Sequence, residues 1–220
     1  MTAVAIYLTA PITKPAKADD RKQETNKTAQ INPVTLTAAS IELLAGNETA
    51  TLDTKLTVPL PYGFKVFNRN RITTPYDEKT IGTTHVLNLA YTLFDNLNVI
   101  TETDIGTTTP IQQRIGLEYK LPFPEGSLYT TAHVAMRAKT DVFWLTNISY
   151  NPAIYESLQL VTNVENVTTI NATGHMASSQ RIRLGLGIGP AQFGGACDLT
   201  EKGNEGKFSY NCGGFVKIVK

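Results

Sequence analysis

Residues 87–97 read Leu-Asn-Leu-Ala-Tyr-Thr-Leu-Phe-Asp-Asn-Leu, and this stretch decides the fold class. Large apolar residues stand at every second position up to Leu93, with polar or small residues between them. Side chains of a β-strand point alternately to opposite faces, so this spacing predicts a strand with one apolar and one polar face. Asp95-Asn96 then marks a tight turn into a second strand. The stretch therefore predicts a β-hairpin.

Tight turns of this kind recur along the chain, with longer polar segments between them. The turns are Pro61-Tyr62-Gly63, Asp95-Asn96, Pro124-Glu125-Gly126, Asn151-Pro152 and Gly189-Pro190. Two of the intervening segments, Thr73–Thr84 and Glu165–Ser179, are predicted to be long loops. Short turns at one rim and long loops at the other are typical of an up-and-down barrel in a membrane. The predicted fold is all-β, an antiparallel up-and-down transmembrane β-barrel of about 12 strands that covers residues 34–220.

Composition limits the other classes of protein. Hydrophobic residues make up 41% of the chain and the mean hydropathy is −0.13, and the sequence contains no long apolar stretch of the kind that forms a transmembrane helix. The formal net charge of +1 gives no reason to expect nucleic acid as a partner. Residues 1–33 are predicted to be a flexible N-terminal tail. The tail holds a short apolar run at Val4–Leu8 that weakly resembles part of a signal segment, although no basic residue precedes the run.

The alternation separates two faces over most of the chain. The apolar face includes Leu56, Val58, Leu87, Leu89, Ile115, Leu117, Ile182 and Leu184. A soluble barrel would turn this face inward, and a membrane barrel would turn it outward. Aromatic residues gather beside the tight turns, as at a membrane interface, and about 12 strands enclose more space than side chains alone fill. Both observations favour the outward orientation; a soluble or assembly-forming antiparallel β protein is the alternative.

Two segments carry a resemblance to a known group of proteins. Residues 87–97, and Ile115–Phe123 before Pro124-Glu125-Gly126, resemble the strand-turn-strand hairpins of bacterial outer-membrane β-barrel proteins. The resemblance extends over residues 34–220 and implies a lipid bilayer as partner and an outer-membrane location, with the extracellular space or cell surface as the alternative. The chain differs from that group at its end, Ile218-Val219-Lys220, where such barrels usually carry an aromatic residue.

The polar face would then line the lumen and contact solutes. The candidate solute-facing residues are Arg69, Arg71, Arg114, Glu118, Lys120, Arg181 and Arg183. Basic residues outnumber acidic residues on this face, which favours anionic solutes. We expect a passive, porin-like channel for small hydrophilic, preferentially anionic solutes. Two alternatives stay open: the arginines hold Glu118 and its neighbours in a structural network, or the lumen is blocked and the long loops carry a structural or surface-interaction role.

Signals for chemistry are weak. His133 lies on the polar face with no paired serine, and no nucleophile motif is present, so we predict no enzymatic activity, no metal site and no cofactor. Cys197 and Cys212 flank a predicted hairpin loop at residues 202–206. A hairpin there sets the two sulfurs opposite each other, and a disulfide would require an oxidising compartment. The alternative is two unbonded small residues. The sequence makes no prediction of the oligomeric state.

Overall fold

A computed structural model describes residues 2–5, 38–77, 80–107, 110–136, 141–203 and 206–220. The predicted N-terminal tail, apart from the short strand β1 (Thr2–Ala5), lies outside the described residues. No helix among the described residues is long and apolar enough to cross a membrane.

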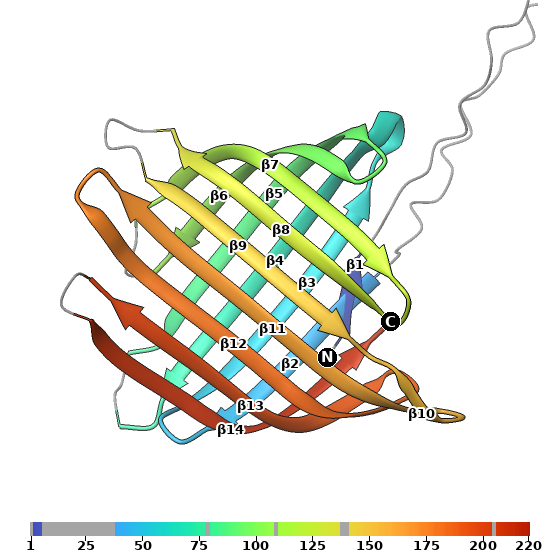
Figure 1. Cartoon of the computed structure of the whole chain (residues 1–220). Coiled ribbons are helices and arrows are strands. Elements are labelled where there is room, and N and C mark those ends of the chain that lie inside the picture. Colours follow the sequence, from blue (N-terminus) through green and yellow to red (C-terminus); the bar gives the residue numbers. More distant parts are fainter. Residues whose placement is uncertain (1, 6–37, 78–79, 108–109, 137–140, 204–205) are drawn as a thin grey trace, which may run out of the picture.

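The strands follow one another around a ring. They are β2 (Ala38–Gly46), β3 (Thr49–Pro59), β4 (Phe64–Pro75), β5 (Gly82–Phe94), β6 (Leu97–Gly106), β7 (Gln112–Phe123), β8 (Gly126–Ala135), β9 (Val142–Tyr150), β11 (Leu158–Asn171), β12 (Gly174–Ile188), β13 (Ala191–Lys202) and β14 (Lys207–Val219). Each pairs antiparallel with the next, and β14 returns to pair with β2 from Gly213 opposite Gly46 to Val219 opposite Ser40. The result is a closed 12-strand barrel, so the predicted fold class is confirmed (Figure 1).

Two short strands are added to the ring. β1 lies against both β2 and β3, antiparallel to the first and parallel to the second. β10 (Ala153–Tyr155) pairs with β11 beside a tight turn, while β9 pairs directly with β11 along its length. The segment after the predicted turn Asn151-Pro152 is therefore divided, and the ring strand begins only at Leu158.

The tight turns gather at one end of the barrel, which we call the turn rim. The 3-10 turn Pro61–Gly63 joins β3 to β4, and Tyr62 and Glu125 take left-handed backbone angles, with φ of 65° and 62°. Such angles let the chain reverse within a few residues. The opposite end, the loop rim, holds the other connections.

The loops at the loop rim are shorter than predicted. β4 continues to Pro75 and β5 starts at Gly82, so strands take in both ends of the predicted loop Thr73–Thr84. The predicted loop Glu165–Ser179 is wrong, because β11 and β12 continue through it to a turn after Asn171. Thr168 lies opposite Ser178 and their hydroxyl oxygens are 3.1 Å apart. Such cross-strand hydroxyl pairs stabilise a sheet, which is why this polar segment is not a loop.

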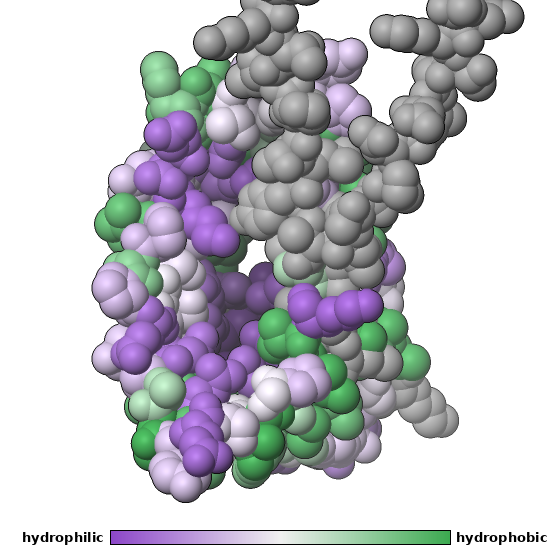
Figure 2. Space-filling model, turned by 90° about the vertical axis from the view of Figure 1, so that its right-hand side faces the viewer, coloured by the Kyte–Doolittle hydropathy of each residue, from purple (hydrophilic) through white to green (hydrophobic). Residues whose placement is uncertain are grey.

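The two faces of the sheet point as predicted. The side chains of Leu89, Leu117 and Leu184 are outside and 44%, 50% and 57% exposed, whereas Arg114 and Arg183 are inside and 7% and 5% exposed. Figure 2 views the molecule from the side of the turn rim and shows hydrophilic residues lining the hollow. The barrel thus has an apolar exterior and a charged interior.

Candidate functional site: the charged lumen

Charged residues on opposite walls of the barrel meet in the lumen. On β3 and β4, Lys55 lies opposite Arg69 in register, and Asp53 lies opposite Arg71. On the far side of the ring, Glu165 of β11 lies opposite Arg181 of β12. Because all these positions are on the inward face, their long side chains reach across the interior.

Arg69 connects the two walls. Its Nε donates to Asp53 Oδ1 at 3.0 Å and its Nη2 to Asp53 Oδ2 at 2.5 Å, while its Nη1 donates to Glu165 Oε1 at 3.2 Å. Glu165 also accepts a hydrogen bond from Arg181 and lies 3.6 Å from the Nζ of Lys55. β4 and β11 are far apart around the ring, so these contacts span the lumen.

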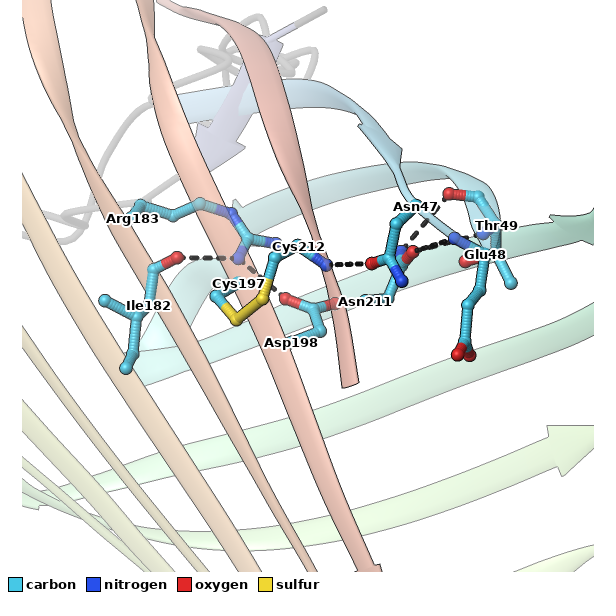
Figure 3. The surroundings of a disulfide bond; sticks show 9 residues. All are labelled: Asn47, Glu48, Thr49, Ile182, Arg183, Cys197, Asp198, Asn211 and Cys212. Carbon is cyan, nitrogen blue, oxygen red and sulfur yellow. Dashed lines mark hydrogen bonds and ion pairs between the residues drawn. A yellow bond between two sulfur atoms is a disulfide. The ribbon is translucent and has the colours of Figure 1, made fainter. Parts of the chain in front are cut away.

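A second connection joins β4 to β13. Arg71 Nη2 donates to Asp198 Oδ2 at 2.5 Å, and Arg183 Nη1 donates to Asp198 Oδ1 at 2.7 Å. Arg183 Nε also donates to Glu42 Oε1 of β2 at 2.8 Å. Figure 3 shows Arg183 directed at Asp198. We use the name arginine cluster for the group formed by Arg69, Arg71, Arg181, Arg183, Lys55, Glu42, Asp53, Glu165 and Asp198.

Other lumenal charges form a separate group on β6 to β9. Arg114 Nη1 donates to Glu102 Oε1 at 2.5 Å, and its guanidinium lies 4.6 Å from the centre of the Phe143 ring. His133, which the sequence places on the polar face, is 1% exposed, and its Nδ1 is 3.5 Å from Glu102 Oε1. These contacts fix Arg114 against the wall.

Glu118 forms the centre of a further set of contacts. It pairs with Lys65 of β4 and accepts hydrogen bonds from Asn98 Nδ2 at 2.7 Å and from the Tyr129 hydroxyl at 3.0 Å. Lys120 lies on the same inward row of β7, one step nearer the turn rim. All the candidate solute-facing residues therefore face the interior, but the five arginines among them each hold a lumenal carboxylate. Contact with a solute stays a prediction.

Sequence reasoning missed several acidic members of the lumen. Asp53 and its neighbour Lys55 alternate with the outward Leu56 and Val58, so extending that strand toward its start would have found them. Glu42 and Asp198 likewise lie between residues that point outward. With these carboxylates included, the predicted excess of basic residues becomes smaller.

Part of the inner wall is apolar, contrary to the expectation of a wholly polar lumen. Leu44, Val161, Ala196 and Phe215 are buried together, and Phe215 is 3% exposed. Phe215 lies opposite Gly194 in register. These apolar side chains line a part of the lumen where the alternation pattern predicts polar residues.

Two asparagines fix the junction between the first and last ring strands, and a disulfide lies beside it. The Oδ1 of Asn211 accepts hydrogen bonds from the backbone N–H groups of Glu48 and Thr49 at 3.0 and 3.1 Å. The Oδ1 of Asn47 accepts from the N–H of Cys212 at 2.7 Å. Figure 3 shows these contacts beside the Cys197–Cys212 disulfide, which joins β13 and β14 at positions that are opposite in register.

The comparisons with known proteins bear on the fold alone. No family model matches the chain, and no curated protein matches it. LpxR from Salmonella typhimurium aligns over 83% of this chain and 99% of its own, with a TM-score of 0.46 and 7% identity. OmpT, an outer membrane protein of Vibrio cholerae in its trimer form, aligns over 83% and 97%, with a TM-score of 0.36 and 9% identity.

The prediction that the chain is not an enzyme requires correction. The fold that the chain shares with solved barrels such as LpxR gives no ground for excluding catalysis, because function depends on sites and not on the fold.

The location follows from the geometry of the barrel. A closed ring satisfies the backbone hydrogen bonds of its strands internally, and leucines and aromatic residues cover its exterior. The charged residues that a bilayer would exclude are inside. The chain has a β-barrel fold of the outer-membrane type.

Proposed function

We propose that this protein is a narrow channel of the outer membrane that passes small hydrophilic solutes. The observation that carries the proposal is the ion pair between Arg69 and Glu165, because it crosses the lumen between side chains of opposite walls. Side chains change rotamer within nanoseconds when they are free to do so, whereas a wall strand does not move. A constriction made of side chains therefore limits the size of a solute without sealing the barrel permanently.

The burial of the lumenal charges indicates how wide the channel is expected to be. Glu165 and Arg183 are each 5% exposed, so little free space surrounds them. Solutes of the size of an oligosaccharide would need the arginine cluster to separate. Water and small ions would need only local shifts of side chains, and they are the solutes that we assign to the resting channel.

The test is conductance across a planar bilayer, with Glu165→Gln as the informative variant. Loss of this negative charge leaves Lys55, Arg69 and Arg181 without their shared counter-charge, so the cations repel one another and the Arg69–Glu165 connection weakens. We expect a higher single-channel conductance than in the native protein. Glu156→Gln is the matched control, because Glu156 is exposed in a turn outside the lumen.

Wild-type protein that shows no conductance, although it is folded and inserted, would contradict the proposal. It would favour the second candidate, a barrel that is closed by its own ion pairs and acts as a structural component of the membrane. The burial of Glu165 and Arg183 is the observation that supports this candidate. A surface role through long loops loses part of its basis, because strands take in both ends of Thr73–Thr84 and nearly all of Glu165–Ser179.

A further inference from the structure

Arg71 holds a donor that no described residue uses. Its Nη2 donates to Asp198, but its Nη1 is buried without a hydrogen-bond partner among the described residues. A buried donor that lacks a partner costs about 1–3 kcal/mol, and more for a charged group. An arrangement of this kind is stabilised by any ligand that supplies an acceptor.

The carboxylate nearest to Arg71 does not supply it. Asp198 accepts from Arg183 through Oδ1 and from the Nη2 of Arg71 through Oδ2, and neither oxygen accepts from Nη1. Arg181 is opposite Asp198 in register but pairs with Glu165, and it is close enough to Arg71 for their like charges to repel. Arg71 and Arg181 are thus both neighbours of Asp198, Arg71 through a hydrogen bond and Arg181 through the strand register.

The arginine cluster as a whole carries surplus positive charge. Its cationic members are Lys55, Arg69, Arg71, Arg181 and Arg183, and its carboxylates are Glu42, Asp53, Glu165 and Asp198, so the cations exceed the carboxylates by one. Lys217 lies opposite Glu42 on β14 and adds to this surplus. An enclosed region with excess positive charge attracts anions.

We propose that Arg71 and Arg181 form a binding site in the lumen for a small anion that carries a carboxylate or a phosphate. Guanidinium groups bind both kinds of anion through parallel N–H donors in a planar fork. The site rests on the proposed function in one respect, namely that the anion reaches it through the channel. It assigns small anions as the class of solute that pauses at the constriction.

The test is titration calorimetry on the full chain, folded in detergent micelles, with inorganic phosphate and acetate as separate probes. We expect the native protein to bind at least one of them. Arg71→Gln removes the orphan donor and one charge, and should weaken binding about tenfold or more. Lys65→Gln is the matched control: it removes one positive charge from the same strand and the same face, but Lys65 pairs with Glu118 outside the cluster. Its affinity should equal that of the native protein.

A second variant, for which tighter anion binding is expected, keeps the test decisive if Arg71→Gln folds poorly. Asp198→Asn removes a negative charge and weakens the hold on the Nη2 of Arg71, so this variant should bind the anion more tightly than the native protein. Native protein that binds neither probe, or equal affinities in the native, Arg71→Gln and Asp198→Asn proteins, would overturn the site. Because calorimetry in micelles needs no transport, binding without conductance would refute the channel alone, and conductance without binding would refute the site alone.

Discussion

At the scale of single residues, adjacent glycines of β13 have opposite tolerance for a side chain. A Cβ added at Gly194 would lie 2.2 Å from the carbonyl oxygen of Leu184, whereas a Cβ added at Gly195 would lie 3.9 Å from the same atom. Gly194 is on the inward face, where β12 and β13 approach too closely for any side chain. We expect Gly194→Ala to reduce the free energy of unfolding by about 1–3 kcal/mol, the cost of overpacking.

The measurement is urea unfolding of the protein folded in detergent or lipid, and Gly195→Ala is its internal control. The control substitution points outward, where the added Cβ makes only an ordinary van der Waals contact, and it should change stability by less than Gly194→Ala does. Equal losses in the two variants would mean that the contact with Leu184 is not the cause, because the reduced freedom of the unfolded chain by itself makes an alanine variant more stable.

At the scale of elements, the disulfide fastens the last hairpin of the barrel. Cys197 and Cys212 are 15 residues apart in sequence and connect β13 to β14, the strand that closes the ring against β2. A crosslink that closes a loop of this length is expected to contribute about 3 kcal/mol, mainly by restricting the unfolded chain. A Cys197→Ser, Cys212→Ser double variant should unfold at a lower urea concentration by a corresponding amount. A reducing agent should lower the midpoint of the native protein and leave that of the double variant unchanged; an effect on both would point to a cause other than this bond.

The elements also show how far sequence reasoning reaches. The alternation in residues 87–97 was enough to predict the strand, its turn at Asp95-Asn96 and the direction of its leucines, because each depends on neighbours in the chain. The ion pair of Arg69 with Glu165 joins residues 96 positions apart, and its prediction needs the curvature of the whole ring. The prediction of a loop at residues 165–179 was wrong for a different reason. The threonines, asparagines and serines of this segment have the composition of a loop, but their side chains form hydrogen bonds with one another across β11 and β12.

At the scale of the whole molecule, the barrel is stable only if hydrocarbon surrounds its leucines. Leu117 and Leu121 lie on the same strand, β7, and both point outward, with 50% and 40% of their surface exposed. Leu117 is in the middle of the strand, and Leu121 is near the turn rim.

In a membrane barrel, arginine at the bilayer midplane costs about 2–4 kcal/mol and arginine near the interface costs about 0–1 kcal/mol. Leu117→Arg should therefore destabilise the protein in lipid vesicles far more than Leu121→Arg does, as measured by reversible unfolding in urea. In a protein surrounded by water, neither substitution would reduce stability, since arginine at an exposed position is harmless or favourable there. Equal stability of Leu117→Arg and the native protein in vesicles would therefore mean that the leucine face does not meet lipid.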